Sequence, residues 1–267
     1  NYATKNVPYY AKYKSNRLLD FPILTKDIIR SNFNNLISST YKGKTITTYS
    51  GGSTGEPVPI KHCQEHIDWT NGLLFHYYKT NFKKSWQEAT TLEIWGSPSD
   101  IKNKEGKNIY KHLKNIVYSS YCYNCFIFNE TDYMKCIHIL NSKKPYFLKG
   151  YVNSLLELAT FIEKNNIKVH SPKYILPRSS PLERKGRKYL EKVFESTTCD
   201  LYGSREVSAI AAETLPLNEN KYNVFNSNCF VEVDENNDLL ITTFHNYSMP
   251  IIRFKIGDKS SILSPEV

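Results

Sequence analysis

The sequence predicts an α/β protein, in which helices cover a mostly parallel sheet and a smaller antiparallel β subdomain follows. The first observation is the alternation of strand-like and helical segments over residues 151–203. Parallel strands need a crossover connection, usually a helix, so this alternation favours a parallel sheet. The second observation is that two apolar runs flank a polar turn beyond residue 221, which is typical of a hairpin. We therefore expect an α/β region at 1–220 and an antiparallel subdomain at 221–267.

The first 95 residues are expected to contain short helices, a hairpin and one long helix. Thr25 is a suitable N-cap for one of several helical pieces within residues 1–40. Runs of β-branched residues predict two strands around a glycine-rich stretch, and an apolar face predicts the long helix that follows. The strands cover 45–49 and 58–60, the helix covers about 65–79 with Ile67, Leu73, Leu74 and Tyr77 on its apolar face, and a buried strand covers 89–95.

Three further helices alternate with strands in the middle of the chain. Residues Asn129–Asp132 are expected to cap the first of them. The helices cover 129–140, 154–164 and 182–195, and the strands cover 144–150, 167–176 with a break at Pro172, and 199–202. Inward-facing residues are Leu155, Leu158, Ala159 and Ile162 on the second helix, and Tyr189, Leu190, Val193 and Phe194 on the third. The hairpin strands cover 230–233 and 239–243.

Length and composition are those of a soluble globular protein. The chain has 267 residues, of which 40% are hydrophobic and 23% are charged. No apolar run approaches the length that a membrane span requires. The chain begins at Asn1 and ends in a strand-like segment at Val267, so we expect it to be part of a longer protein.

The net charge of +9 raises the question of nucleic-acid binding. The lysines are scattered among asparagines, however, and no arginine-rich helix or basic block is present. This distribution argues against a nucleic acid as the partner, whereas a small polyphosphate substrate gains from a basic surface in any arrangement.

Six cysteines lie at positions 63, 122, 125, 136, 199 and 229. Only Cys122 and Cys125 have the spacing of a metal or redox pair, and no second pair completes a four-cysteine zinc site. Cys199 and Cys229 stand in apolar segments, where a thiol acts as a small hydrophobic group. We therefore expect reduced thiols and a cytoplasmic location.

The glycine-rich stretch has the composition of a phosphate-binding loop. Glycines allow close approach of backbone amides to an anion, and hydroxyls add donors. Glu56 and Pro57 stand where a Walker loop needs a lysine and a helix, and the glycine spacing does not fit a dinucleotide fingerprint. The alternative is an ordinary turn between two strands. The candidate residues are Ser50, Gly51, Gly52, Ser53, Thr54 and Gly55.

Two further segments carry candidate ligand-binding residues. Tyr202 and Gly203 follow a strand, at the end where open α/β sheets bind ligands. Glu206 offers a hard oxygen ligand for magnesium, and Asp258, after a glycine, can accept from both hydroxyls of a ribose. The alternatives are a common turn at Tyr202, a helix cap at Glu206 and the start of a hairpin at Asp258.

Together and in this order, the three segments resemble motifs of the adenylate-forming (AMP-binding) superfamily of acyl-CoA synthetases. Ser50–Pro57 is similar to its phosphate loop, Tyr202–Glu206 to its adenine and magnesium motif, and Phe254–Asp258 to its ribose motif. Within the superfamily the chain resembles phenylacetate–CoA ligase and related proteins of capsular polysaccharide biosynthesis. The segments that carry this closer resemblance are Val7–Tyr10, Phe21–Lys26, Lys149–Leu155 and Met249–Asp258.

The chain also departs from the pattern of that branch. Phe254 and Lys255 replace the tyrosine and arginine of the ribose motif, which keeps an aromatic ring and a cation. Residues 177–181 replace a frequent Gly-Glu pair. Thr214 stands after Glu213 where some relatives have a zinc-binding cysteine, so no zinc site is carried over. The small C-terminal domain of the superfamily, which holds its catalytic lysine, is expected to be absent from these 267 residues.

The resemblance implies a ligase that converts a carboxylic acid and Mg·ATP into an acyl-adenylate and passes the acyl group to CoA or another acceptor. By the same resemblance, Ser50–Gly55 cradle the β- and γ-phosphates, Tyr202, Gly203 and Ser204 flank the adenine and the acyl carboxylate, Glu206 holds Mg²⁺, and Asp258 holds the ribose. Arg253 and Lys255 approach the phosphates, although Arg253 can equally brace a surface pair.

The expected catalytic lysine lies in the absent domain, so these 267 residues alone are expected to be a weak catalyst. The alternative to an enzyme is a non-catalytic nucleotide-binding or scaffold protein with the same fold. The intact Glu206 and Asp258 argue against such a loss of turnover. Trp95, Tyr118 and Tyr121 are candidates for the acyl pocket and equally for the apolar core.

Overall fold

The structure is a computed structural model that describes residues 2–13, 17–50, 57–95, 119–124, 129–217 and 221–260. It divides into two compact units. The terminal unit comprises Asn1–Leu74, Tyr202–Ala211 and Tyr222–Val267, and the central unit comprises Phe75–Leu201 and Ala212–Lys221. This division differs from the expected boundary at residue 220, because the first 74 residues group with the C-terminal strands.

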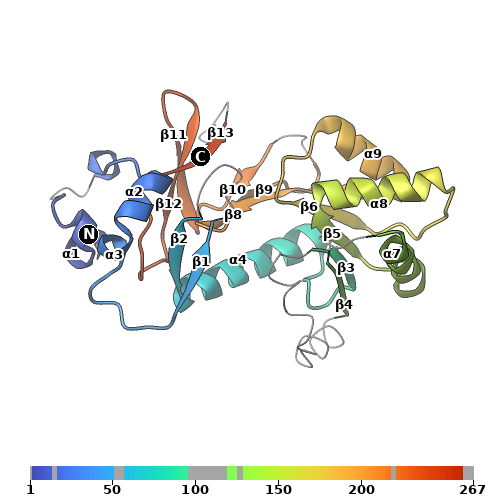
Figure 1. The fold of residues 1–267 in the computed structure, drawn as a ribbon, viewed down its shortest axis with the longest axis horizontal. Coiled ribbons are helices and arrows are strands. Elements are labelled where there is room, and N and C mark those ends of the chain that lie inside the picture. Colours follow the sequence, from blue (N-terminus) through green and yellow to red (C-terminus); the bar gives the residue numbers. More distant parts are fainter. Residues whose placement is uncertain are drawn as a thin grey trace. The chain divides into compact units, whose positions relative to one another are not determined.

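The central unit contains a five-stranded, entirely parallel sheet (Figure 1). The strand order is β4-β3-β5-β6-β7. Its strands are β3 (Thr91–Ile94), β4 (Ser120–Tyr123), β5 (Phe147–Tyr151), β6 (Tyr174–Arg178) and β7 (Thr197–Thr198). The predicted α/β class and parallel sheet are therefore confirmed.

Helices α7 (Glu130–Lys143), α8 (Val152–Lys164) and α9 (Arg184–Phe194) supply the apolar partners of this sheet. The expected cap of α7 is present as a capping box, in which Asn129 and Asp132 each bind the other's backbone amide. Leu190 and Phe194 of α9 are buried as predicted. Buried residues shared by sheet and helices include Leu92, Ile94, Leu140, Leu148, Leu155, Leu158, Ala159, Ile162 and Ile175.

Two predicted strands in the central unit differ from the structure. The segment expected to start at residue 167 is a strand only from Tyr174, after the proline at 172 that cannot donate to a ladder. The strand expected at 199–202 does not belong to the parallel sheet, whose last strand is Thr197–Thr198; residues 201 and 202 instead begin β8 (Leu201–Ser204), which joins a different sheet. Strand β4 was not predicted.

The terminal unit is built from both ends of the chain. Its helices are α1 (Tyr2–Asn6), η1 (Pro8–Tyr10), η2 (Leu18–Asp20), α2 (Lys26–Ser31) and α3 (Phe33–Leu36). Its strands form a hairpin of β1 (Thr45–Tyr49) and β2 (Pro59–Cys63), a sheet β10-β9-β8 and an antiparallel sheet β11-β12-β13. The bounds of the latter strands are β9 (Ser208–Ala212), β10 (Asn223–Val224), β11 (Cys229–Val233), β12 (Asp238–Thr243) and β13 (Phe254–Lys259).

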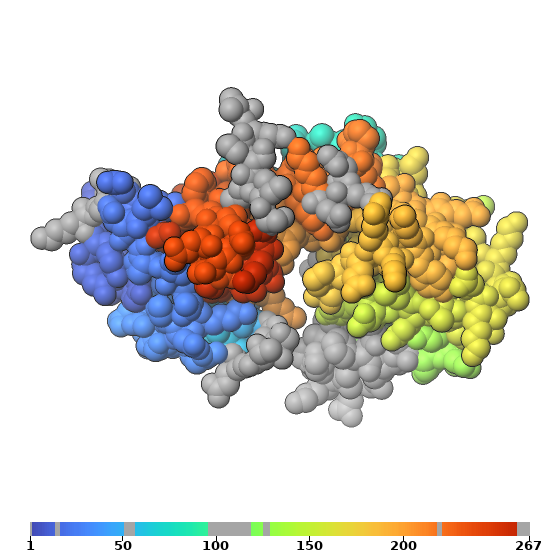
Figure 2. Space-filling model, turned by 90° about the horizontal axis from the view of Figure 1, so that it is seen from above, coloured from blue at the N-terminus to red at the C-terminus, as the bar shows by residue number. Residues whose placement is uncertain are grey.

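A direct backbone contact ties the N-terminal helices to the C-terminal sheet. The amide of Leu24 donates to the carbonyl of Arg253 at 3.0 Å, and Leu24 forms a bridge with Phe254. Both side chains are completely buried, and Figure 2 shows the blue N-terminal segment packed against the red C-terminal strands. Thr25 caps α2 as expected, since its hydroxyl accepts from the Ile28 amide at 3.3 Å. This packing explains why residues 1–74 group with the antiparallel strands.

Helix α4 (Gln64–Phe82) contributes residues to both units and confirms the predicted long helix. Its buried face differs from the prediction, however. Tyr77 is buried as predicted, but Ile67, Leu73 and Leu74 are only half-buried, whereas the polar His66 and Thr70 are buried. Among the described residues, no helix combines the length and the apolar character that a membrane span requires.

Candidate functional site

Two of the predicted site residues meet in the terminal unit. The hydroxyl of Tyr202, on β8, donates to Oδ2 of Asp258, on β13, at 2.6 Å. Burial, followed by the nearby Asp258 carboxylate, raises the pKa of Tyr202, so the phenol keeps its proton and remains a donor. A residue of the predicted adenine motif therefore contacts a residue of the predicted ribose motif.

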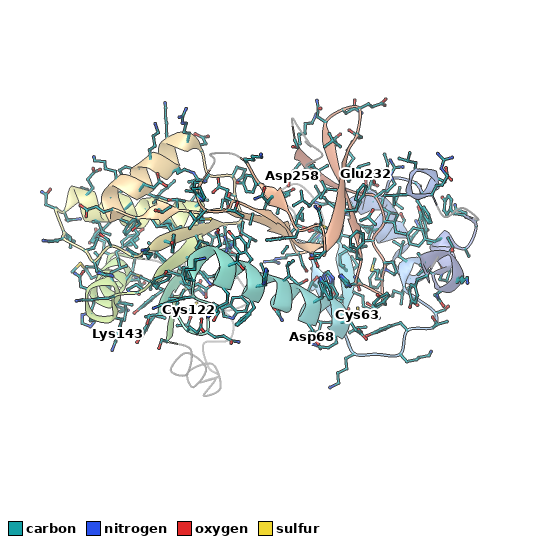
Figure 3. The ribbon with its side chains drawn as sticks, turned by 180° about the vertical axis from the view of Figure 1, so that it is seen from behind. Cys63, Asp68, Cys122, Lys143, Glu232 and Asp258 are labelled. Atoms are coloured by element: carbon teal, nitrogen blue, oxygen red, sulfur yellow. The ribbon has the colours of Figure 1, made fainter. Side chains whose placement is uncertain are left out.

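The backbone around Asp258 departs from a regular strand, which sets the direction of this side chain. The register between β12 and β13 shifts between Asp238 and Leu240. Gly257 has a φ of 102°, a conformation that L side chains rarely adopt. Irregularities of this kind redirect side chains at the ends of strands. Figure 3 labels Asp258 on β13 and Glu232 on β11, which lies in the same sheet on the other side of β12.

Gly203 has a structural reason that does not involve a ligand. A Cβ at this position would overlap the carbonyl oxygen of Ser208 and lie 3.2 Å from Cα of Ala209. The glycine therefore permits the close approach of β9 to β8. Any role of Gly203 beside a nucleotide remains a prediction.

Glu206 lies in the turn between β8 and β9 and is buried, with 5% of its surface exposed. A strand rather than a helix follows it, so the helix-cap alternative is wrong. The side chain of Ser204 accepts from the Glu206 amide at 3.2 Å. One ion pair is present, with Lys26 Nζ at 3.8 Å, and that lysine is 42% exposed. The carboxylate is thus held in place by its surroundings and has only one distant cationic partner among the described residues.

The two strands that flank the candidate phosphate loop form the predicted hairpin, in which Tyr49 pairs with Pro59. Two hydrogen bonds close the base of the loop. The Ser50 amide donates to the Val58 carbonyl at 2.9 Å, and the Val58 amide donates to the Ser50 hydroxyl at 2.9 Å. The remaining candidates, Gly51, Gly52, Ser53, Thr54 and Gly55, lie outside the described residues.

The two candidate cations of the third motif have carboxylate partners. Nε of Arg253 lies 3.3 Å from Glu232, and its Nη1 donates to the carbonyl of Phe21 at 3.0 Å. Lys255 pairs with Asp238 at 2.5 Å. Arg253 thus joins the N-terminal segment to the sheet. Of the two predictions for this residue, phosphate contact or an ion pair, the structure contains the ion pair. A role of either cation at the phosphates remains a prediction.

Of the three aromatic residues predicted to line the acyl pocket or the core, the two that the structure describes lie in different surroundings. Trp95, directly after β3, stacks on Tyr151, the last residue of β5, with ring centroids 4.3 Å apart. Tyr121 packs against the apolar core of that unit. Tyr118 lies outside the described residues, as does Cys125. The five described cysteines are free thiols, and Cys199 and Cys229 are buried as expected.

Two buried histidines were missed by sequence reasoning. His62 is the next-to-last residue of β2, before Cys63, which Figure 3 labels, and His66 lies in the first turn of α4. Their rings stack at 5.1 Å, and each Nε2 has a partner in or beside the β8–β9 turn. Their positions on either side of a strand–helix junction give no periodic signal, because His62 belongs to β2 and His66 to α4.

Comparison with known proteins adds one related sequence and many related folds. No family model matches the chain. Protein CapK of Staphylococcus aureus is 26% identical over 97% of this chain. The chain spans 59% of the length of CapK.

The similar solved structures include CoA ligases. An open conformation of 2-hydroxyisobutyryl-CoA ligase in complex with 2-HIB-AMP and CoA has a TM-score of 0.68 at 13% identity, covering 96% of this chain and 66% of that one. The anthranilate CoA ligase AuaEII in complex with anthranoyl-AMP has a TM-score of 0.55 at 13% identity, covering 78% and 41%. At this identity the likeness shows the fold, and the expected fold is confirmed.

Proposed function

Because this chain has the fold of the adenylate-forming enzymes, we propose that it is the nucleotide-binding part of an ATP-dependent carboxylate ligase. In the proposed first step, an oxygen of the carboxylic acid attacks the α-phosphorus of ATP. The bond between that phosphorus and the pyrophosphate oxygen breaks, leaving an acyl-adenylate and pyrophosphate. In the second step the acyl group passes to the thiol of CoA or to another nucleophile, and AMP leaves.

The contact between Tyr202 and Asp258 is the observation that carries this proposal. These residues come from segments 56 positions apart, and their side chains meet at 2.6 Å. In the proposed complex the Asp258 carboxylate accepts hydrogen bonds from the ribose hydroxyls. The ring of Tyr202, held by its own hydroxyl, then offers a flat surface to the adenine.

Glu206 fits the requirements of a magnesium ligand. Mg²⁺ prefers hard oxygen ligands and is usually bound by one or two carboxylates together with substrate phosphates. The Glu206 carboxylate is buried, and its only ion pair among the described residues, at 3.8 Å, is longer than a direct hydrogen bond. When bound, Mg²⁺ would neutralise charge on the phosphates. Ser50 would fix the base of the loop whose glycines cradle the β- and γ-phosphates.

The proposal also extends to the acceptor of the acyl group and to the pathway. The similarity to CapK, over 97% of this chain, supports a branch of the ligases that serves capsular polysaccharide biosynthesis. The complexes of similar folds with CoA or an acyl-adenylate support CoA as one candidate acceptor. We therefore propose a small carboxylic acid, ATP with Mg²⁺, and CoA or a cell-surface sugar precursor as the reactants.

Binding of Mg·ATP to Asp258→Asn tests this assignment. A ligand that binds only the folded state adds about 2.7 kcal/mol of stability at a hundredfold excess over its Kd. The parent chain should show this stabilisation in a thermal melt, and Asp258→Asn should lose most of it while its melting temperature without ATP changes little. The matched control is Asp27→Asn, which alters an exposed carboxylate of α2 paired with Arg30. A parent chain that millimolar Mg·ATP does not stabilise would contradict the proposed function.

A further inference from the structure

His62 and His66 bring two imidazole rings into the interior of the terminal unit. Their exposed fractions are 4% and 1%, and the rings stack with an angle of 11° between their planes. Nδ1 of each ring is buried and has no hydrogen-bond partner among the described residues. Burying a polar nitrogen without a hydrogen bond costs free energy, and a phenylalanine would fill the same space without that cost. Packing alone therefore does not explain a histidine here.

The contacts of His62 join two segments of the candidate site. Its Nε2 lies 3.0 Å from the carbonyl oxygen of Arg205 and 3.1 Å from the hydroxyl of Thr48. Because a carbonyl oxygen can only accept, Nε2 carries the proton in this contact. Burial lowers the pKa of His62, so the ring is neutral and its bare Nδ1 faces the interior.

The carbonyl that His62 holds belongs to the peptide that leads into Glu206. The amide of that same peptide donates to the Ser204 hydroxyl at 3.2 Å. Both polar groups of the Arg205–Glu206 peptide are therefore fixed, one by His62 and one by Ser204. This leaves the backbone of the proposed magnesium ligand little freedom to rotate.

The second partner of His62 lies in the hairpin of the phosphate loop. Thr48 is on β1, two residues before Ser50, whose hydroxyl closes the loop base. One ring nitrogen thus contacts both the strand that enters the loop and the turn that carries Glu206. His66 Nε2, by contrast, contacts the Ser208 hydroxyl at 2.9 Å and, within the described part of the chain, makes no hydrogen bond to Thr48 or to Arg205.

We propose that His62 is a positioning residue, which holds the Glu206 turn in register with the phosphate-loop hairpin and thereby couples Mg²⁺ binding to ATP binding. The proposal rests on the proposed function. His62 itself contacts neither substrate nor metal. It acts through the Arg205 carbonyl, and its effect should therefore be confined to the metal-dependent part of nucleotide affinity.

The test measures the Kd of ATP by calorimetry, once with excess Mg²⁺ and once with EDTA, for the parent chain and three variants. Partners behind a metal ligand typically contribute about 10–100-fold to metal affinity. The ratio compared is the Kd in EDTA divided by the Kd in Mg²⁺. His62→Phe should reduce this ratio by about tenfold or more, because its Kd in Mg²⁺ rises while its Kd in EDTA is nearly unchanged. His62→Gln, whose amide can donate to the Arg205 carbonyl, should restore most of the ratio. His66→Phe is the matched control, and it should leave the ratio unchanged.

Each alternative outcome has a distinct meaning. A parent chain that fails to bind ATP in Mg²⁺ contradicts the proposed function itself. A parent that binds Mg·ATP while His62→Phe keeps the full ratio overturns the positioning role. The same conclusion follows if His62→Gln loses the ratio as completely as His62→Phe, because the donor would then be irrelevant. If His62→Phe does not fold, His62→Met, which also removes the donor and leaves the direct contact of Thr48 with the Arg205 carbonyl intact, must lower the ratio for the proposal to stand.

Discussion

Asp258, Tyr202 and Glu206 show how separate short motifs acquire one chemical meaning only after folding. Each had an ordinary alternative as a turn, a cap or a hairpin start. The structure places the Tyr202 hydroxyl on Asp258 and buries Glu206 in the adjacent turn. Residue types and their order were enough to propose these three positions. Their mutual contact depends on β8 and β13, which pair with different strands and are far apart in the sequence.

The buried His66 is expected to make the unfolding free energy depend on pH in the acidic range. Burial, with a contribution from His62 and His245, lowers the pKa of His66 from 6.5 to about 4. Its neutral form therefore stabilises the fold fully above pH 6.5, and this contribution is lost as the pH falls from 6.5 to about 4. At about 1.4 kcal/mol for each pKa unit, the loss is about 3 kcal/mol.

We therefore expect the unfolding free energy of the parent chain to fall over this pH range, and His66→Phe to have a flatter profile. Denaturant titrations at several pH values measure this slope. His138→Asn is the control, since His138 is exposed on α7 and its replacement should leave the slope as it is in the parent. Equal slopes in His66→Phe and the parent would show that His66 does not titrate in this way.

At the scale of the element, the close approach of β8 to β9 explains a glycine that sequence reasoning assigned to ligand access. A Cβ on Gly203 would meet the backbone of Ser208, which cannot move without disturbing the strand pair. We expect Gly203→Ala to destabilise the terminal unit by about 1–3 kcal/mol. Gly72→Ala is the control, because nothing lies within 4 Å of a Cβ there and alanine favours a helix by about 1 kcal/mol. Denaturation midpoints that rise in both variants would contradict the steric account.

Helix α9 is fastened to the central unit by a buried ion pair. Both carboxylate oxygens of Glu213 lie 2.8 Å from Nη2 of Arg187, and Nη1 of that arginine donates to the Thr198 carbonyl at 2.7 Å. Removing one partner of a buried pair leaves an uncompensated charge and typically costs about 3–5 kcal/mol. We expect this cost for Glu213→Leu, measured by urea denaturation. Glu163→Leu, which breaks an exposed pair with Lys192, should cost less than about 1 kcal/mol. Similar costs for the two variants would contradict this assignment.

The helices and the hairpins were predicted well because their signals are local. Thr25 and Asn129 cap helices through contacts within three residues, and the apolar faces of α8 and α9 follow the helical period. Strand β4 and the polar buried face of α4 were missed for the opposite reason. Burial of His66 depends on Ser208, which lies 142 residues away, and no local pattern contains that partner.

For the whole molecule, the least predictable feature is the grouping of both chain ends into one unit. Leu24 and Phe254 form a backbone bridge across most of the sequence, whereas composition and periodicity placed them in different regions. This grouping also gathers the described candidates for nucleotide binding, Ser50, Tyr202, Glu206 and Asp258, in the terminal unit. The resemblance of motifs predicted the fold correctly because motif order reflects the fold even where individual contacts cannot be foreseen.

The central claim is that these residues serve the adenylation of a carboxylic acid, and isotope exchange between pyrophosphate and ATP measures that step directly. The measurement uses the full-length protein and a panel of small carboxylic acids, since the present chain spans 59% of the length of CapK. We predict exchange that requires both an acid and Mg²⁺ and that falls by about 10²-fold or more in Glu206→Gln. ATP binding without exchange for any acid would instead indicate a non-catalytic nucleotide-binding protein, and exchange that is equal in Glu206→Gln and the parent would contradict the assigned magnesium site.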